Sequence, residues 1–248
     1  MMPAPTMQLT RIWSGGVEGS ALDLYDLVSA PGAPWELEIG FGKGRYLLRR
    51  AEEDPHRRFL GIEIAGQYYR LARDRAARRG LENLTLVHGE ALFLLDAFLP
   101  RGWVDVAHVY FPDPWPKARH HKRRLFDPET IDVLLRSLAK PSGRLLFASD
   151  HLAYAAKVRR LLAAHPSLQI VERDAWPEGP RTNYEAKYEE EGRTICRLEV
   201  DFVAPDPQRQ RLGPGPLEEG LELLHPEGAY GITSALSPPR AADEEIEV

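Results

Sequence analysis

Three glycines at alternate positions stand in the stretch Glu36-Leu37-Glu38-Ile39-Gly40-Phe41-Gly42-Lys43-Gly44. They follow a short apolar run at 35–39 and precede a segment of helical period at 44–53. Glycine at such a turn lets the backbone reverse tightly and lie close to a ligand. The stretch therefore predicts a strand, a ligand-contacting turn and a helix, which is a typical unit of an α/β sheet.

The same alternation of apolar runs and helix-period segments continues along the chain. The apolar runs lie at 35–39, 59–64, 84–88, 104–110 and 144–148, and the helix-period segments at 44–53, 67–79, 128–139 and 153–164. Nearly continuous apolar runs are typical of parallel strands with helices on both faces. Two further runs, at 168–173 and 194–202, are joined by a polar segment and predict an antiparallel hairpin without a helix between its strands. We expect a mostly parallel, seven-stranded, Rossmann-like α/β sheet.

Composition divides the chain into three parts. We expect an N-terminal segment at 1–34, one α/β domain at 35–204, and a Pro-rich acidic extension at 205–248 that is partly disordered rather than packed. The chain has a formal net charge of −5, and nine acidic and three basic residues lie in the extension. The rest of the chain is therefore close to neutral, so the acidic average does not argue against a nucleic-acid partner.

The cysteine and hydropathy patterns limit the location of the protein. Cys196 is the one cysteine, so it cannot form an intrachain disulfide or a multi-thiolate zinc site. No stretch approaches the roughly 18 apolar residues of a spanning helix, and residues 1–13 lack the pattern of an export signal. His120 and His121 lack a third ligand at a suitable spacing, so we expect no metal site. We expect a cytoplasmic protein without a membrane contact, and the sequence leaves monomer and homodimer open.

Acidic residues follow the ends of three successive predicted strands. Glu38 stands two residues before the glycine turn, Glu63 ends the second strand and Glu90 follows the third. A carboxylate beside a GxGxG turn would repel a pyrophosphate and favours a cationic ligand such as S-adenosylmethionine. The pattern predicts a class I methyltransferase, in which Glu38, Gly40 and Gly42 contact the cofactor, Glu63 its ribose and Glu90 its adenine.

A stiff loop and a dense basic run follow the fourth predicted strand. Prolines at 112, 114 and 116 restrict the backbone around Asp113 and Trp115. Five bases and two histidines follow within 117–124, a density that suits phosphate contacts. A solvated basic loop is the alternative interpretation, and the arginines of 67–79 are a competing RNA surface. Trp115, Tyr110 or Tyr184 is expected to stack on an extruded base.

The segment 111–124 resembles the bacterial tRNA (guanine-N7-)-methyltransferase family, whose members carry Phe-Pro-Asp-Pro-Trp followed by Lys, Arg, His and a Lys-Arg-Arg cluster. Residues 147–150 place an Asp where the family has one, and 181–185 match its Thr-x-Phe/Tyr-Glu motif. The resemblance spans about 35–202. It implies methyl transfer from S-adenosylmethionine to N7 of guanine in tRNA, at position 46 of the variable loop.

The resemblance also implies roles for single residues. The residues that match the family's cofactor-binding positions are Glu38, Glu63, Glu90 and Asp113. The residues that match its substrate-binding positions are Lys117, Asp150, Thr182, Asn183, Tyr184 and Glu185. Guanine N7 carries a lone pair and no proton, so the reaction needs no general base. Asp113, the expected catalytic residue, or Asp150 would stabilise the positive charge that forms on the ring.

Two other functions stay open at this stage. One is a methyltransferase for another RNA or a small molecule, which the basic run at 117–124 disfavours. The other is a non-catalytic RNA-binding protein of the same fold. That second function would be expected to lack one of the strand-end acids or Asp113, and all of them are present.

Overall fold

The computed structural model describes residues 11–19, 21–30, 32–114, 124–128, 130–138 and 143–203. The predictions that concern the extension at 205–248, Trp115, Lys117, the two histidines at 120 and 121, and the basic run up to residue 123 lie outside the described residues. No helix in the described part is long and apolar enough to cross a membrane.

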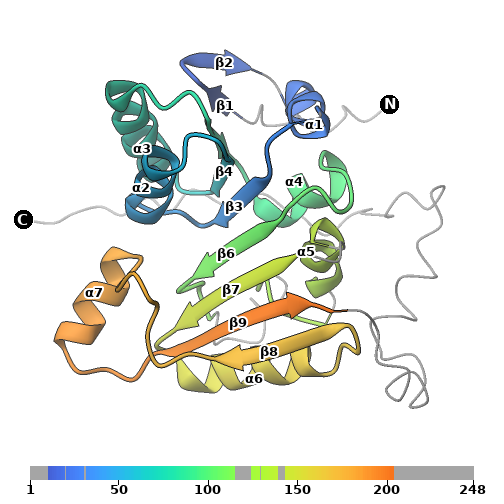
Figure 1. Ribbon diagram of the computed structural model, residues 1–248, viewed down its shortest axis with the longest axis vertical. Coiled ribbons are helices and arrows are strands. Elements are labelled where there is room, and N and C mark those ends of the chain that lie inside the picture. The colour runs from blue at the N-terminus through green and yellow to red at the C-terminus, as the bar shows by residue number, and fades with distance from the viewer. Residues whose placement is uncertain are drawn as a thin grey trace, which may run out of the picture.

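The described strands form one nine-stranded sheet in the order β2-β1-β5-β4-β3-β6-β7-β9-β8 (Figure 1). The strands are β1 Arg11–Ser14, β2 Val17–Gly19, β3 Trp35–Ile39, β4 Arg58–Glu63, β5 Leu84–His88, β6 Val106–Tyr110, β7 Arg144–Ser149, β8 Leu168–Glu172 and β9 Cys196–Phe202. The helices are α1 Ala21–Ser29, α2 Arg45–Glu53, α3 Gly66–Arg79, α4 Ala91–Ala97, α5 Ile131–Ser137, α6 Leu152–Ala163 and α7 Asn183–Glu190.

Strand β3 lies at the point where the winding of the sheet reverses. It pairs in parallel with β4 on one side and with β6 on the other. The chain adds β4 and β5 in one direction and β6 and β7 in the other. In open α/β sheets ligands bind beyond the carboxyl ends of the strands at such a reversal, which here is the glycine turn after β3.

The two faces of β3 carry different side chains because residues alternate along a strand. Trp35 and Leu37 belong to the main apolar core, which includes residues of α1, α4, α5 and α6. A second core cluster joins α2 and α3 to β4 and β5. Glu36 and Glu38 also point to the α2 side, where both are buried. This arrangement places two carboxylates inside the protein beneath the expected ligand edge.

Two expectations about the sheet were wrong. The structure places α7 between β8 and β9, where we expected no helix, and the N-terminal strands β1 and β2 raise the strand number from seven to nine. Helix α7 is largely polar, NYEAKYEE, so it lacks the apolar period that predicts a helix. Strand β1 is only four residues long, but it pairs antiparallel with β5 and thereby joins the N-terminal segment to the sheet.

Candidate functional site

The glycine turn after β3 has a backbone that only glycine adopts readily. Gly40, Gly42 and Gly44 have φ of 73°, 53° and 73°, in the left-handed region. A Cβ atom at Gly44 would lie 3.2 Å from atoms of Ala72 and Leu48, whereas one at Gly40 or Gly42 would meet no atom within 4 Å. Gly44 therefore serves helix packing, and Gly40 and Gly42 border open space at the strand ends.

Glu63 holds this turn in place. Its Oε2 accepts a hydrogen bond from the amide of Gly42 at 2.8 Å, and its Oε1 accepts one from the amide of Ala65 at 2.8 Å. The side chain is 7% exposed. A single carboxylate thus joins the loops after β3 and β4 and fixes the shape of the edge where the strand-end acids meet.

Glu38 is the acid of this edge whose charge is least compensated. It is 3% exposed, and its Oε2 has no hydrogen-bond partner in the described part of the chain. Burial raises the pKa of Glu38 to about 8; the Leu47 amide opposes this rise, and the neighbouring Glu63 adds to it. A buried acceptor without a partner is costly, and a cationic ligand would remove that cost.

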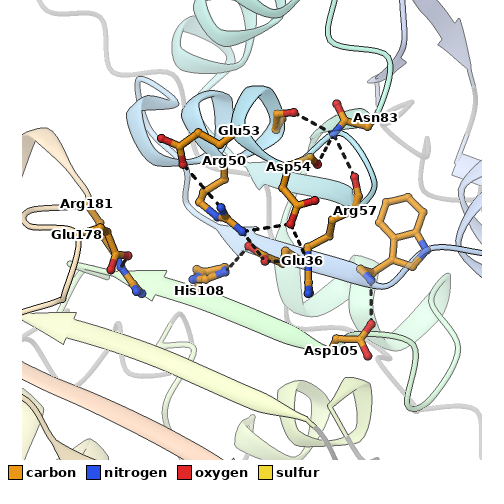
Figure 2. A network of polar contacts seen from close by, with 12 residues as sticks. Glu36, Arg50, Glu53, Asp54, Arg57, Asn83, Asp105, His108, Glu178 and Arg181 are labelled. Atoms are coloured by element: carbon orange, nitrogen blue, oxygen red, sulfur yellow. Dashed lines mark hydrogen bonds and ion pairs between the residues drawn. The ribbon is translucent and has the colours of Figure 1, made fainter.

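Glu36, two residues earlier on the same face of β3, is fully compensated. Figure 2 shows its carboxylate between His108 and the arginines Arg50 and Arg57, with N–O distances of 3.1 Å, 3.3 Å and 3.3 Å. Burial alone would raise the pKa of Glu36. The hydrogen bond from His108, together with the charge of Arg50, instead lowers it to about 2. Glu36 is therefore a structural anion of the core.

A buried chain of hydrogen bonds leads from Glu36 towards the substrate-side segment. His108 Nε2 lies 3.1 Å from Glu36 Oε2, and His108 Nδ1 lies 2.8 Å from the hydroxyl of Tyr110. Burial lowers the pKa of His108, so the ring is neutral at pH 7. Its Nε2 then donates to Glu36 and its Nδ1 accepts from Tyr110, whose oxygen accepts from Arg181. Every member of this chain has a partner.

Arg181 anchors the segment that carries the expected substrate residues. Its guanidinium lies 4.1 Å from the ring centre of Trp176 and 5.2 Å from that of Tyr46, and it pairs with Glu178 at 2.6 Å. Tyr46 belongs to α2, directly after the glycine turn. The segment before α7 is therefore packed against α2, the helix that follows the glycine turn.

Thr182 and Glu185 form the beginning of α7. The Thr182 hydroxyl accepts a hydrogen bond from the amide of Glu185 at 3.0 Å, an N-cap contact. Glu185 has no exposed surface; it accepts from the amide of Arg181 at 2.8 Å and from Nε of Arg197 at 2.7 Å. We expected Glu185 to engage the substrate directly, but in the structure both its oxygens are used to hold the helix.

The other expected substrate residues on this segment and at the end of β7 are accessible. Tyr184 is 55% exposed, and its ring lies 6.3 Å from that of Phe111. Asn183 Oδ1 lies 3.5 Å from Arg45, the first residue of α2. Asp150 pairs with Arg193 at 3.3 Å. These contacts bring the α7 segment, the glycine-turn helix and the loop after β6 together at one edge of the sheet.

The loop after β6 begins with a strained residue. Phe111 has φ of 51°, unusual for a residue with a side chain, and the exposed Asp113 follows it. Arg124, at the far end of the basic run, donates from Nε to the carbonyl of Pro114 at 2.7 Å and is 9% exposed. Arg124 therefore closes the base of the loop and is not available as a surface phosphate contact.

Two further expectations concern Glu90 and Tyr110. Glu90 is exposed and caps α4, because its oxygens accept from the amides of Leu92 at 3.0 Å and Phe93 at 2.7 Å. Tyr110 is 6% exposed and belongs to the core chain described above, so it does not present a stacking surface. In the described part of the chain, no group of three or more His, Cys, Asp or Glu residues could hold a metal ion.

The chain is similar to known proteins over most of its length. The family model described as "Putative methyltransferase" matches residues 32–198. The tRNA (guanine-N(7)-)-methyltransferase of Nitrosococcus oceani is 41% identical over 165 residues, which cover 65% of this chain and 69% of that protein. This chain belongs to the tRNA (guanine-N(7)-)-methyltransferase family. The member from Streptomyces avermitilis is 34% identical over 215 residues, covering 83% of this chain and 72% of that protein.

Solved methyltransferase structures share the fold of this family member. The 16S rRNA methyltransferase KamB superposes with a TM-score of 0.59 at 17% identity and covers 79% of this chain and 100% of its own. A 16S rRNA (adenine(1408)-N(1))-methyltransferase from Catenulisporales acidiphilia gives 0.53 at 20% identity, with 80% and 100% covered. The expected class I methyltransferase fold, mostly parallel with a C-terminal antiparallel pair, is confirmed.

Sequence reasoning missed several residues that shape this tRNA (guanine-N(7)-)-methyltransferase family site. Arg181 lies directly before the Thr-x-Phe/Tyr-Glu motif, yet nothing in the sequence indicates that its guanidinium packs against aromatic rings. Tyr188 and Arg193 lie in the polar segment that we expected to be without a helix. The i,i+4 spacing of Tyr184 and Tyr188 would have indicated a shared surface if α7 had been predicted, whereas Arg193 lies beyond the end of that helix.

Proposed function

We propose that this chain transfers a methyl group from S-adenosylmethionine to N7 of guanine in tRNA, at position 46 of the variable loop. The observation that carries the proposal is the buried Oε2 of Glu38, which has no hydrogen-bond partner among the described residues, together with the open space at Gly40 and Gly42 two and four residues later. The family's activity, as its members are named, requires a cationic methyl donor at such a place. A tRNA substrate also implies a cytoplasmic location.

The residues at the strand ends fit this cofactor. Glu38 would face its positive charge, the backbone of Gly40 and Gly42 would border it, and Glu63 would meet its ribose by exchanging one of its amide partners. Glu90, on the exposed cap of α4, would lie at the adenine end. When bound, S-adenosylmethionine supplies a methyl group on a sulfonium, which needs no activation by the protein.

The chain's own residues then position the base and stabilise charge. Asp113 is exposed at the same edge, and its carboxylate would favour the positive charge that develops on the guanine ring. Tyr184 offers a stacking surface, and Asn183 and Asp150 offer polar groups to the base edge. Lys117 would contact a phosphate. Thr182 and Glu185 hold these groups in position through α7 and are not placed in contact with the base.

Methyl transfer is tested by incubating the protein with labelled S-adenosylmethionine and unmodified tRNA, and by mapping the product through cleavage at N7-methylguanine. We expect one cleavage site in the variable loop. Absence of label in tRNA, in a preparation that binds the cofactor, would contradict the proposed substrate. Label at another nucleotide would favour a methyltransferase with a different RNA target, and cofactor-independent tRNA binding alone would favour a non-catalytic RNA-binding protein.

A further inference from the structure

A cavity of about 670 Å³ lies beside the proposed substrate edge, between α6, the end of β8 and the beginning of β9. Leu152 and Cys196 belong to its wall. Leu152 begins α6, three residues after the end of β7, and Cys196 pairs with Ser149 at that end. The cavity therefore opens at the same carboxyl edge of the sheet as the glycine turn and Asp150.

Arg193 joins the substrate edge to this cavity. Its Nη1 pairs with Asp150 at 3.3 Å and its Nε with Glu191 at 2.6 Å. The guanidinium lies 4.3 Å from the ring centre of Tyr188, a cation–π geometry that fixes the position of a long side chain. Since 48% of the side chain is exposed, a guanidinium edge remains for a ligand.

Two more arginines on the cavity wall also have N–H groups that can donate hydrogen bonds to a ligand. Arg159 pairs through Nε with Glu172, and Arg173 pairs through Nε and Nη2 with Glu199. The side chains of Arg159 and Glu172 are 57% and 58% exposed, and an ion pair in that setting contributes little. A phosphate can therefore compete for these guanidinium groups.

The remaining wall suits the other parts of a nucleotide. Ile195, Ala155 and Leu152 provide apolar surface, and Thr194 provides a hydroxyl. The wall also carries the acids Glu172, Asp174 and Glu189, but Glu172 is paired with Arg159, and Glu189 with Arg197. A cavity lined by arginine donors and apolar side chains fits an anionic ligand with a flat ring system.

We propose that this cavity binds a nucleotide of the substrate RNA that flanks the methylated guanosine, with Arg193 contacting its phosphate. The inference rests on the proposed function, since the RNA would reach the cavity from the edge formed by Asp150 and Tyr184. A single-stranded segment that leaves this edge passes Arg193 first and the cavity next. Arg159 and Arg173 then contact the following phosphate.

Cys196 is a natural reporter for this test, because it is the chain's one cysteine and it lies half-buried on the cavity wall. We expect saturating unmodified tRNA to slow its reaction with N-ethylmaleimide at least tenfold, and S-adenosylhomocysteine alone to leave the rate unchanged. Methyl transfer is measured in the same preparation. An unchanged thiol rate in a preparation that methylates tRNA would overturn the inference and leave the proposed function intact.

Variants give a second, independent measurement. We expect Arg173→Gln and Arg159→Gln each to raise the KM for tRNA at least threefold and to reduce the slope of log KM against log salt by roughly 0.7. The affinity for S-adenosylhomocysteine should not change. Arg101→Gln is the matched control, because Arg101 is exposed near the beginning of β6, at the opposite edge. Equal KM values for the three variants would contradict a nucleotide in the cavity.

Discussion

Glu36 and Glu38 lie two residues apart on the same buried face of β3, yet their carboxylates have opposite electrostatic surroundings. His108 and Arg50 hold the pKa of Glu36 at about 2, whereas Glu38 has an oxygen without a hydrogen-bond partner among the described residues and a pKa of about 8. A protein can tolerate such an uncompensated acid where a ligand supplies the missing charge. The contrast identifies Glu36 as a structural acid and supports our proposal that Glu38 binds the cofactor.

The first prediction is that Glu38→Gln stabilises the ligand-free protein at high pH. In the unfolded chain Glu38 loses its proton above its ordinary pKa of 4.5, whereas in the fold it keeps the proton to about 8. The stability that this group contributes is therefore present below pH 4.5 and is lost as pH rises towards 8. A neutral glutamine removes that loss, so we expect the melting temperature at pH 8.5 to rise by about 4 °C or more.

Glu36→Gln is the matched comparison for that measurement. It removes the negative charge from a site where Arg50, Arg57 and His108 all face the carboxylate. We expect a loss of stability of about 1–3 kcal/mol at pH 7, because the partly buried Arg50 and Arg57 lose a buried carboxylate partner and keep only their pairs with exposed or partly exposed acids such as Asp54. Urea unfolding of both variants checks the contrast, and a destabilised Glu38→Gln at pH 8.5 would contradict our assignment of the two acids.

The second prediction concerns cofactor binding against pH. A cationic cofactor needs the ionised form of Glu38, so binding must release the proton that the ligand-free protein holds below pH 8. We expect the affinity for S-adenosylmethionine to fall by up to tenfold for each pH unit below about 8. The cofactor's own ionisation affects wild type and Glu38→Gln alike, so the measured quantity is the difference between them. Parallel affinity profiles would show that Glu38 does not contact the cation.

The third prediction concerns the buried chain from Glu36 to Arg181. Tyr110→Phe removes the hydroxyl that accepts from Arg181 and donates to His108. His108 and Arg181 then each lose one hydrogen-bond partner, and we expect a loss of about 1–3 kcal/mol in the free energy of unfolding. Turnover should fall as well, because Arg181 anchors α7. Tyr25→Phe, on the exposed side of α1, serves as the control and should change neither quantity.

The sequence predicts the strands, helix and turn at the glycine-turn edge well because local signals define them. The glycine turn requires left-handed backbone, and the strand at 84–88 and the helix at 44–53 agree with the structure to within one residue. The beginning of α7 depends instead on contacts between distant residues. Arg197 lies 12 positions after Glu185, and Tyr110 lies 71 before Arg181, so no local pattern indicates that Glu185 is buried.

Contacts between distant residues also explain why the sequence could not distinguish structural from functional charged residues. Glu36 and Glu38 occupy equivalent positions in the alternating pattern of the strand. Only the positions of Arg50, Arg57 and His108 make the surroundings of the two carboxylates different. Arg124 ends a basic run and looks like its neighbours, but the structure turns its guanidinium inward to Pro114 and over the ring of Tyr154 at 5.6 Å. Contacts with other parts of the chain, which a charge pattern does not contain, decide each of these roles.

The fourth prediction separates Arg124 from the two bases before it. Arg124→Ala removes a buried hydrogen bond and a cation–π contact, so we expect it to lower the free energy of unfolding by about 1–3 kcal/mol. The double variant Lys122→Ala with Arg123→Ala should leave that free energy within about 0.5 kcal/mol of wild type. It should weaken tRNA binding and reduce its salt slope. Equal unfolding midpoints for the two proteins would contradict this division.

The last prediction compares two acids of the site, Asp113 and Glu185. Asp113 is exposed, so Asp113→Ala should leave the unfolding midpoint within about 1 °C of wild type and lower turnover at least 100-fold by removing a charge from the transition state. Glu185→Ala removes one of the two carboxylate partners of the buried Arg197, which keeps Glu189, and should cost about 1–3 kcal/mol. The turnover of Glu185→Ala should fall in parallel with its unfolding as temperature rises. The turnover of Asp113→Ala should be low at every temperature. Full activity of Asp113→Ala would remove Asp113 from the mechanism.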